Sequence, residues 1–467
     1  MIRSVLMGLM LAAIGTPAAA RVCAPDAVET RHEAAIAGRR LAYVACVGAL
    51  PVRVGQAGAR IVYTAYLVPG RRRPLSFVWN GGPGADSRTL QFHAIGPRVI
   101  RDGALVDNPA SPLARTDLVF VDPVDTGFSR ADTPAEASAF YGTLADIAAT
   151  ASVIRDFRQR YRRAASPLNL VGESFGTWRA SGVAEALVDA HVPVAGVALI
   201  SGGIPLGEDK GGERRRALSL VNRAATAFAL GRLPTDLQRD QAATLAEVER
   251  WADTVYAPAL ADPAALDAGR RAAIIDRLAR YQGLAPAAID AKTLWVSPRD
   301  FRTRLLGAEG KTLGIFDMRQ TTPAARTGED ALALAYYRHD LGYTAGRYAG
   351  LDEAAGDVGG AWRYDQSPVT PQSLARAIAG EGPPSASQPW IQRAMAKHSG
   401  LRVWVATGLY DSLNSCAGNA ATVAALPAGL RARFTLRCYA GGHMMYEDPR
   451  ETRRFGDDLA AFLASGA

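Results

Sequence analysis

The sequence predicts an α/β fold in which a mostly parallel sheet is flanked by helices and interrupted by a helical insertion. Three observations support this prediction. Short apolar runs alternate with helical patterns from residue 41 to 200, helical periodicity dominates from 205 to 388, and strand-like runs return after residue 400. Strands that alternate with helices form parallel sheets covered on both faces, so the returning strands are expected to complete the same sheet.

Strands are expected wherever a short apolar run is bounded by turn-forming residues. The first two runs, 41–47 and 61–68, predict a hairpin. Helical patterns separate the later runs, which therefore predict parallel strands. The later runs are 75–79, 118–121, 168–171, 194–200, 401–406 and 434–439.

Helical periodicity predicts two helices between the core strands and three inside the insertion. They span 144–161, 177–190, 213–229, 244–256 and 264–281. The insertion has few strand-like runs, as is typical of a cap inserted into a larger domain. The predicted organisation is a core domain of residues 21–204 and 389–467 with a helical cap of residues 205–388.

The first twenty residues have the plan of a cleavable secretory signal, 1–20. Arg3 precedes an apolar run at 5–14, and small residues at 18–20 predict cleavage after Ala20. The alternative is an uncleaved membrane anchor, but an anchor needs about 20 consecutive apolar residues and this run is shorter. We therefore expect an exported protein, periplasmic or secreted, without a stable membrane anchor.

Four cysteines remain after the signal segment, and an even number in an oxidising compartment favours two disulfides. Cys23 with Cys46 would fasten the N-terminal arm, and Cys416 with Cys438 would link the last two core segments. This pairing is one of three possible connectivities, and four buried thiols are the alternative.

The net charge of +8 and the pI near 9.4 do not by themselves indicate a nucleic acid or membrane partner. The arginine clusters at 71–73, 162–163 and 214–216 are short and lack interleaved aromatic residues, so they are expected to be solvated surface. Gly310-Lys311-Thr312 fails as a phosphate-binding loop because Leu305 occupies the position of its first glycine. No metal-binding spacing occurs, so we expect no metal and no cofactor. Because the arginine clusters are short, we also expect no nucleic acid partner.

The most informative segment is Gly172-Glu173-Ser174-Phe175-Gly176, which follows the strand 168–171 and precedes the helical pattern 177–190. A serine between two glycines at a tight strand-to-helix turn forms a nucleophile elbow, which lifts the hydroxyl clear of the sheet. In a loop the same pentapeptide would mean little. The flanking strand and helix therefore make Ser174 the predicted nucleophile.

Partners for Ser174 are expected just beyond the carboxyl ends of other strands. Asp411 and His443 follow the last two predicted strands. An imidazole takes the serine proton and a buried carboxylate fixes its tautomer, and the order Ser, Asp, His is that of the α/β-hydrolase triad. Among the six histidines, His93 is the one serious rival because it lies soon after a glycine-rich strand end.

Asn80-Gly81-Gly82-Pro83-Gly84 follows the strand 75–79 and offers a backbone without obstructing side chains. Acyl transfer needs hydrogen-bond donors for the oxyanion that develops in the transition state. We expect the Gly82 amide and the Phe175 amide to supply them. The alternative is an ordinary glycine-rich turn, and the elbow in the same chain favours the functional interpretation.

Several of these segments together resemble the serine carboxypeptidase family. They are Trp79 to Gly84, Gly172 to Ser174, Gly442 to Met444 and the block Pro123 to Ser129. The resemblance covers the predicted core but not the cap. It implies an α/β hydrolase that removes residues from peptide C-termini, mostly at acidic pH, and whose partners are peptides with a free C-terminus.

The resemblance also implies that Asn80, the Gly81 amide and Glu173 hold the terminal carboxylate of the substrate. Two carboxylates within hydrogen-bond distance must share a proton, so a substrate anion beside Glu173 raises the affinity of the pair for protons. Acid pH should then favour binding. The alternative is that Glu173 is a structural carboxylate bonded to nearby amides.

Some positions depart from the family pattern. Ala85-Asp86-Ser87 replaces a cysteine and two serines, Phe175 replaces a tyrosine, and Asp125 stands where glycine is common. The loop after His443 is shortened. These departures leave the predicted triad intact but leave open which side chain is preferred beside the scissile bond.

The sequence thus predicts an exported serine carboxypeptidase that acts through an acyl-enzyme. Ser174 is the nucleophile, His443 the general acid and base, and Asp411 the residue that orients it. Two alternatives remain, namely an acyltransferase or esterase on the same scaffold and a catalytically inactive binding protein. The preferred C-terminal residue, the role of the cap and the oligomeric state stay open.

Overall fold

A mixed sheet lies at the centre of the computed structural model, which describes residues 21–464 except 71, 208–211, 323–327 and 379–385. The proposed signal segment 1–20 lies outside the described residues. The strands are β1 Val28–Ile36, β2 Arg39–Val54, β3 Ala57–Leu67, β4 Leu75–Trp79, β7 Asp117–Val121, β8 Arg130–Ala131, β9 Leu168–Glu173, β10 Gly196–Ile200, β11 Arg402–Gly408 and β12 Phe434–Tyr439. Their order is β1-β2-β3-β7-β4-β9-β10-β11-β12, and β8 pairs with β3.

The larger part of the sheet is parallel. From β7 through β4, β9, β10 and β11 to β12, every neighbouring pair is parallel. β4, β9 and β10 are buried along their whole length because helices cover both faces. The predicted hairpin is the antiparallel pair of β2 and β3. The predicted fold class, an α/β-hydrolase fold, is therefore confirmed.

The sequence patterns do not predict β1 or the small hairpin of β5 Arg98–Arg101 and β6 Ala104–Asp107. β1 is an edge strand that contains Arg31, His32 and Glu33, and most of its residues are exposed or half-buried. Charged residues are common on edge strands because they discourage pairing with other chains. Such a strand lacks the continuous apolar run by which the buried strands are predicted.

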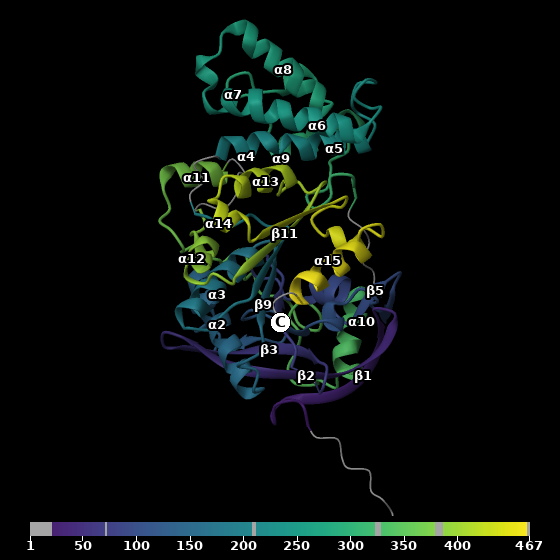
Figure 1. Cartoon of the computed structure of the whole chain (residues 1–467), viewed down its shortest axis with the longest axis vertical. Coiled ribbons are helices and arrows are strands. Elements are labelled where there is room, and N and C mark those ends of the chain that lie inside the picture. The colour runs from purple at the N-terminus through teal and green to yellow at the C-terminus, as the bar shows by residue number, and fades with distance from the viewer. Residues whose placement is uncertain (1–20, 71, 208–211, 323–327, 379–385, 465–467) are drawn as a thin grey trace, which may run out of the picture.

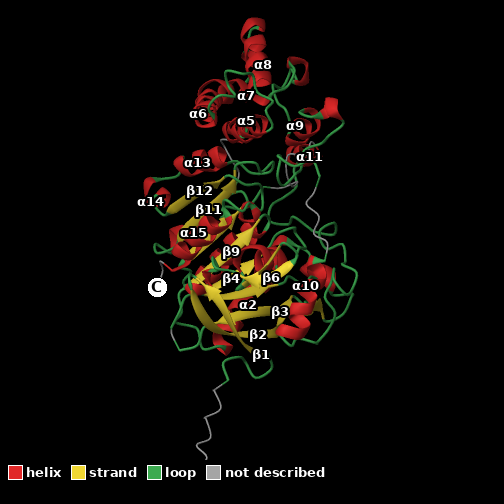
Figure 2. Ribbon diagram, turned by 90° about the vertical axis from the view of Figure 1, so that its right-hand side faces the viewer, coloured by secondary structure: helices red, strands yellow, loops and turns green. Residues whose placement is uncertain are grey.

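Helices cover both faces of the sheet (Figure 2). α2 Thr143–Arg160, α3 Gly176–Asp189 and α12 Trp390–Lys397 share one hydrophobic core with strand residues such as Leu170. Its neighbour Val171 lies in the other core, with residues of α15 Thr452–Ala464. Successive residues of a strand point to opposite faces, so each buried strand contributes to both cores.

A helical lobe extends from the end of the molecule opposite β1 (Figure 1). Its helices are α4 Gly212–Leu218, α5 Leu220–Ala229, α6 Gln241–Trp251, α7 Ala257–Ala261, α8 Ala268–Gln282 and α9 Pro298–Arg304. The helix expected at 213–229 is divided at Ser219 into α4 and α5. Val248, Tyr256, Leu278 and Phe301 are buried inside the lobe, which therefore has a core separate from the two cores of the sheet.

The later part of the insertion returns to the sheet. After α10 Glu329–Ala335, the buried rings of Tyr337 and Tyr348 pack against Phe128 of the core, with ring centres 5.3 and 4.7 Å apart. Ala349 N also donates a hydrogen bond to Gly127 O at 2.9 Å. The insertion thus contains a separate lobe and a segment that packs with the core, and the domain limits given above remain a prediction.

Two disulfides join the cysteines in the expected pairs. Cys23 bonds to Cys46 of β2, and Cys416, at the start of α13 Cys416–Ala424, bonds to Cys438 of β12. The second bridge thus links α13, the helix that follows β11, to the strand β12. In the described ranges, no helix combines the length and apolar character needed to cross a membrane.

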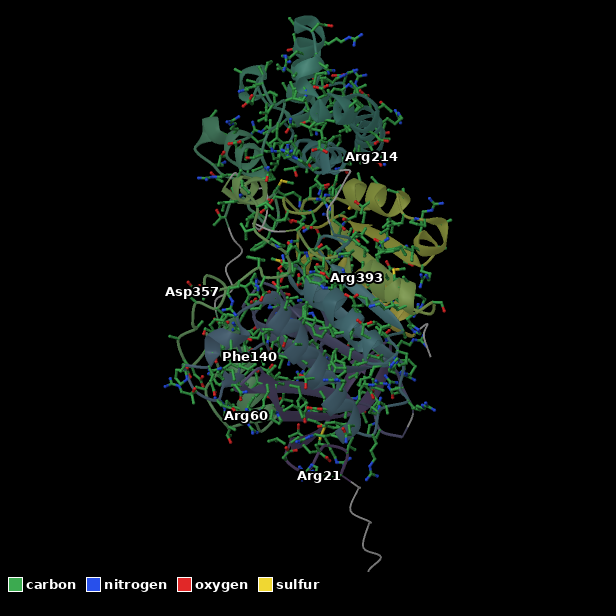
Figure 3. All side chains as sticks on the ribbon, turned by 90° about the vertical axis from the view of Figure 1, so that its left-hand side faces the viewer. Arg21, Arg60, Phe140, Arg214, Asp357 and Arg393 are labelled. Carbon is green, nitrogen blue, oxygen red and sulfur yellow. A yellow bond between two sulfur atoms is a disulfide. The ribbon has the colours of Figure 1, made fainter. Side chains whose placement is uncertain are left out.

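Ion pairs fasten the lobe and the core internally. Arg214 of α4 pairs with Asp253 inside the lobe at 2.5 Å, and Arg393 of α12 pairs with Glu185 of α3 at 2.6 Å. Figure 3 labels both arginines. Because α3 begins at the predicted elbow, the second pair helps to hold the helix that follows Ser174.

Candidate active site

Ser174 lies in the turn between β9 and α3 with a backbone φ of +57°. A residue other than glycine rarely adopts this left-handed backbone conformation, and the surrounding packing enforces it here. A Cβ at Gly172 would lie 2.0 Å from Gly176 O, and a Cβ at Gly176 would lie 2.9 Å from Asn80 O. Glycine is therefore required on both sides of the serine, and the segment has the geometry of a nucleophile elbow.

Asp411 and His443 lie together beyond the carboxyl ends of β11 and β12. His443 Nδ1 is 2.9 Å from Asp411 Oδ2, and only 3% of His443 and 1% of Asp411 are exposed. Asp411 also accepts hydrogen bonds from Leu413 N at 2.8 Å and from Asn414 Nδ2 at 3.0 Å. The anchored carboxylate can hold the imidazole in one tautomer and leave Nε2 to accept a proton.

Ser174 and His443 share one edge of the sheet. Ser174 N donates to Ile200 O at 2.8 Å, and Oγ of the next residue, Ser201, donates to His443 O at 2.5 Å. Among the hydrogen bonds of the described residues, none joins Ser174 Oγ to the His443 ring. Catalytic hydrogen bonds often form fully only when substrate is bound. The structure thus brings the three predicted triad residues to one site.

The environment of His443 suits a general base. Burial disfavours its charged form, but the charge and the hydrogen bond of Asp411, together with the charge of Glu173, outweigh burial and raise its pKa above the ordinary value. A more basic imidazole takes the serine proton more readily. This shift becomes smaller at acidic pH, because the charge of Glu173 is lost when its carboxyl group is protonated.

The segments that carry the two predicted oxyanion donors lie side by side. A Cβ at Gly81 would be 2.5 Å from Phe175 N and 2.6 Å from Glu173 O, so only glycine allows this approach. Within the described residues, neither the Gly82 amide nor the Phe175 amide donates a hydrogen bond. Both amides are therefore available to a negatively charged oxygen beside Ser174.

Glu173 directly precedes the nucleophile and is 2% exposed. Its carboxylate accepts hydrogen bonds from Tyr446 Oη at 2.8 and 3.0 Å and from Asn80 Nδ2. The Asn80 carbonyl in turn accepts a bond from Arg179 Nη1 at 3.0 Å. We call Glu173, Asn80 and Tyr446 the Glu173 cluster. It contains two of the three residues predicted to hold a substrate carboxylate, and the third, Gly81, lies against the elbow.

Burial raises the pKa of Glu173 to about 7, although the charge of His443 and the hydrogen bond from Tyr446 oppose the rise. A carboxyl group with this pKa is mostly protonated at acidic pH. In that state it is neutral and carries a proton that it can donate to a second carboxylate. The cluster can thus accept an anion below neutral pH and repel one above it.

Two features of the site have little or no sequence signal. The only signal for Tyr446 is its place in the short loop after His443. The Phe175 ring lies 5.3 Å from the Trp362 ring and 6.1 Å from the Tyr364 ring, measured between centres. Both of these rings come from the insertion, so only the folded chain shows that they form an aromatic wall beside the nucleophile.

A cavity of about 390 Å³ opens beside Gly84 of the glycine-rich loop. Its titratable and charged lining residues are Asp86, Arg88, His93, Asp125, Glu329 and Asp330. His93, the rival histidine, lies here with Nε2 3.5 Å from Glu329 Oε2, and it is not part of the Asp411 pair. Asp125 accepts a hydrogen bond from Tyr141 Oη at 2.5 Å. In the described part of the chain, no group of three or more His, Cys, Asp or Glu side chains is arranged to hold a metal ion.

Residues 67–196 match the family model described as serine carboxypeptidase. This range includes the glycine-rich loop and the elbow, and it ends before Asp411 and His443. The predicted resemblance to serine carboxypeptidases is therefore confirmed, and together with the fold it supports a serine hydrolase. The chain matches no curated protein in sequence.

Several solved structures are similar in fold. One is the prohormone-processing carboxypeptidase Kex1 from Saccharomyces cerevisiae, with 16% identity, a TM-score of 0.49 and coverage of 90% of this chain and 91% of that chain. Another is a thermostable carboxyl esterase from Bacillus coagulans, with 11% identity, a TM-score of 0.37 and coverage of 90% and 98%. A third is a proline iminopeptidase from Mycobacterium smegmatis, with 14% identity, a TM-score of 0.34 and coverage of 90% and 98%. These scores are low, so the strand order and the elbow carry the fold argument.

Proposed function

We propose that this protein is a serine-type carboxypeptidase that releases C-terminal residues from peptides through an acyl-enzyme and works best at acidic pH. The observation that carries the proposal is the Glu173 cluster. A buried carboxyl group with a pKa of about 7 lies directly before the nucleophile and is held by Asn80 and Tyr446. A general esterase has no need for such a group, whereas an enzyme that recognises a free C-terminus does.

The triad geometry supports the chemical steps. Ser174 Oγ attacks the carbonyl carbon of the last peptide bond while His443 Nε2 takes its proton, and Asp411 stabilises the imidazolium that forms. The Gly82 and Phe175 amides stabilise the oxyanion. The C–N bond then breaks as His443 returns the proton to the leaving amine. Water, deprotonated by His443, hydrolyses the acyl-enzyme and restores Ser174.

Recognition of the terminal carboxylate gives the enzyme its pH dependence. Below about pH 7 the Glu173 carboxyl is protonated and can donate to the substrate carboxylate, and Asn80 and the Gly81 amide can donate to it as well. Above that pH the ionised Glu173 repels the substrate anion. Binding of peptides with a free C-terminus should therefore weaken as pH rises through 7.

The test compares a blocked dipeptide that has a free C-terminal carboxylate with the same dipeptide as its C-terminal amide, from about pH 5 to about pH 8. The wild type should prefer the free acid, and its KM for the acid should rise at least about tenfold across this range. Glu173→Gln should remove this rise. Glu249→Gln, which replaces an exposed carboxylate of α6 in the lobe, is the control and should keep it.

An unchanged pH profile in Glu173→Gln would show that Glu173 has only a structural role. Equal turnover of the amide at every pH would instead indicate an esterase or acyltransferase on this scaffold. A protein that hydrolyses neither substrate nor a simple ester would be a binding protein.

We further propose that the protein is exported to the periplasm or the exterior of the cell. The two disulfides support this, because disulfides persist in oxidising compartments. Detection of the cysteines as free thiols in the protein isolated from its native cells would contradict it.

A further inference from the structure

Residues 316–319 of the insertion lie against two loops, one that carries Asp411 and one that carries His443. We call these the aspartate loop and the histidine loop, and we call residues 316–319 the clamp segment. Phe316 O accepts a hydrogen bond from His443 N at 2.5 Å, and the two rings lie 5.2 Å apart. Met318 N donates to the carbonyl of Tyr410, the residue before the catalytic carboxylate, at 3.0 Å. The backbone of the clamp segment therefore binds the histidine loop and the aspartate loop at once.

The side chain of Arg319 adds contacts to the same two loops. Its guanidinium donates to Asp317 at 2.9 and 2.5 Å, to Asp448 Oδ2 at 3.1 Å and to Ala440 O at 3.3 Å. It also lies over the ring of Tyr410, 4.2 Å from its centre. Ala440 and Asp448 flank the catalytic histidine in the chain, and Tyr410 precedes the catalytic aspartate. One side chain thus joins the two loops.

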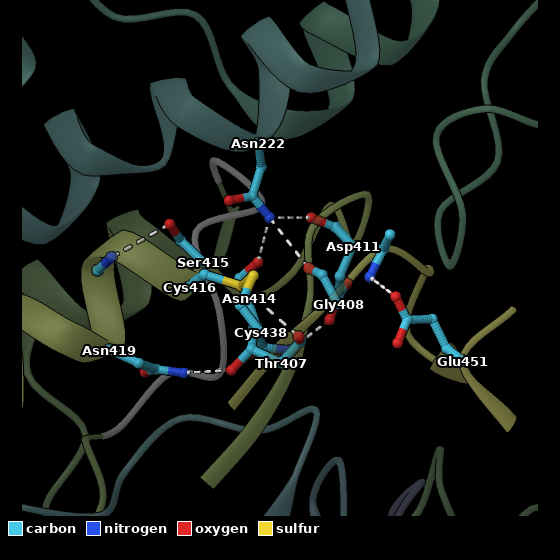
Figure 4. The surroundings of a disulfide bond; sticks show 12 residues. Asn222, Thr407, Gly408, Asp411, Asn414, Ser415, Cys416, Asn419, Cys438 and Glu451 are labelled. Carbon is cyan, nitrogen blue, oxygen red and sulfur yellow. Dashed lines mark hydrogen bonds between the residues drawn. A yellow bond between two sulfur atoms is a disulfide. The ribbon is translucent and has the colours of Figure 1, made fainter. Parts of the chain in front are cut away.

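The lobe supplies a second contact to the aspartate loop through Asn222 of α5 (Figure 4). Asn222 is 2% exposed, and its Nδ2 donates to the carbonyls of Gly408, Asp411 and Asn414 at 3.3, 3.1 and 2.8 Å. These carbonyls all belong to the segment at the end of β11. The insertion therefore holds the aspartate loop through Asn222 and joins it to the histidine loop through Arg319.

The histidine loop is shaped to receive the clamp segment. Gly441 and Gly442 precede His443 and have no side chains of their own to anchor the loop. A Cβ at Gly442 would lie 2.4 Å from Phe316 O and 2.6 Å from the Cβ of Asp317. Glycine at this position is thus required by the close approach of the clamp segment.

We infer that Arg319 is a positioning residue, which holds the loops of Asp411 and His443 at the separation that their hydrogen bond requires. The inference rests on the proposed function. The two loops follow separate strands, and a misplacement of about 1 Å in a catalytic group can lower the rate about 10²-fold. In this role Arg319 touches no reacting atom and acts through the two loops.

The clamp contacts are suited to acidic conditions. A hydrogen bond from Arg450, with a further contribution from Arg319, lowers the pKa of Asp448 to about 2. A carboxylate with so low a pKa keeps its charge over the acidic range proposed for the enzyme. The ion pair between Arg319 and Asp448 therefore persists where the enzyme is expected to be active.

The test replaces Arg319 by Met, which keeps an unbranched apolar stem but removes the guanidinium group with its charge and its donors. We expect Arg319→Met to lower kcat on the blocked dipeptide acid about 10- to 100-fold, because the triad is misplaced. KM should change less than kcat, because Arg319 does not contact Glu173 or Asn80 and only Tyr446 of the Glu173 cluster lies on the loop that Arg319 holds. Arg319→Lys, which restores one cation, should recover part of kcat.

Arg338 provides a matched control. It pairs with Asp352 at 2.8 Å, donates to Tyr343 O at 3.0 Å and lies over the ring of Phe128, 5.0 Å from its centre. Arg338→Met removes the same kinds of contact away from the triad. It should lower the unfolding temperature as Arg319→Met does and leave kcat unchanged.

A kcat of Arg319→Met within about twofold of wild type, or an equal loss in Arg338→Met, would overturn the inference. If Arg319→Met does not fold, Asp448→Asn tests the same link, because it removes the carboxylate through which the loop of His443 holds Arg319; a normal kcat in that variant would also overturn the inference. Ser174→Ala in the same assay separates the two proposals. If it keeps full activity the proposed function fails, whereas an inactive Ser174→Ala beside a fully active Arg319→Met refutes only the positioning role.

Discussion

Ser174 and its oxyanion glycines are placed by close packing of backbones, whereas Asp411 and His443 lie in loops that are bonded to a distant insertion. On the nucleophile side, the turns after β4 and β9 approach so closely that there is no room for a side chain at Gly81 or Gly176. On the acid–base side, the loops after β11 and β12 are joined through Arg319. The first arrangement is local and steric, and the second is long-range and polar.

The difference predicts how each side responds to substitution. Adding a methyl group should damage the nucleophile side, because nothing can move aside for it. Removing a polar partner should damage the acid–base side, because its loops lose their links.

Asp411→Asn should have the largest effect on the acid–base side. The amide cannot hold His443 in the tautomer that accepts the serine proton, so kcat should fall about 10⁴-fold. The measurement is kcat on the blocked dipeptide acid, with circular dichroism to confirm folding. Asp458→Asn is the control. Asp458 lies on α15 and accepts a hydrogen bond from Tyr439 Oη, and the kcat of this variant should remain close to that of the wild type. A loss of less than about tenfold in Asp411→Asn would contradict its assigned role.

Gly81→Ala should damage the nucleophile side by overpacking. The new Cβ would lie 2.5 Å from Phe175 N and would push the glycine-rich loop away from the elbow. Loss of one oxyanion donor costs about 10²-fold in kcat, and we expect a loss of that size. Gly429→Ala, where a Cβ meets nothing within 4 Å, is the control. Wild-type kcat in Gly81→Ala would show that the loop has freedom that the packing does not indicate.

Stability should depend on the protonation of Glu173. Its pKa is raised from 4.5 to about 7, so between these values the folded chain retains a proton that the unfolded chain has released. Stability contributed by this group is therefore lost as pH rises through that window, by about 3 kcal/mol in total. Urea unfolding of the wild type and of Glu173→Gln from about pH 4 to about pH 8 measures the difference. Parallel pH curves for the two proteins would refute the raised pKa.

Removing one of the two disulfides should have the smallest effect on kcat. Cys23–Cys46 and Cys416–Cys438 span 23 and 22 residues, so replacing either pair by serine should cost a similar amount of stability, about 3 kcal/mol. Only the second pair lies beside the catalytic loops, and only its loss should lower kcat, by severalfold. Equal kcat values for the two variants would mean that this bridge does not support the acid–base side.

The nucleophile side could be predicted from the sequence because its constraints are local. The glycines around Ser174 are required by contacts within two short segments, and the strands predicted at Leu75–Trp79 and Phe434–Tyr439 match their observed bounds. Asp411 and His443 could also be predicted, because catalytic groups collect after the carboxyl ends of parallel strands.

The supports of the acid–base side could not be predicted in this way. Arg319 bonds to Ala440, 121 residues later, and Asn222 bonds to Asp411, 189 residues later. No local pattern records a contact of that range. β1 could not be predicted either, because its charged edge residues interrupt the apolar pattern. Local steric constraints can thus be predicted from one sequence, whereas long-range polar contacts are seen only in the folded chain.

Labelling with a fluorophosphonate tests the whole triad at once, because this reagent reacts with a serine only when the nucleophile, the histidine and the oxyanion site work together. We expect one label, mapped by peptide mass spectrometry to Ser174, none in Ser174→Ala, and labelling at least about 10²-fold slower in Asp411→Asn. A protein that stays unlabelled, or one labelled at another serine, would refute the assignment of Ser174, His443 and Asp411 as the triad.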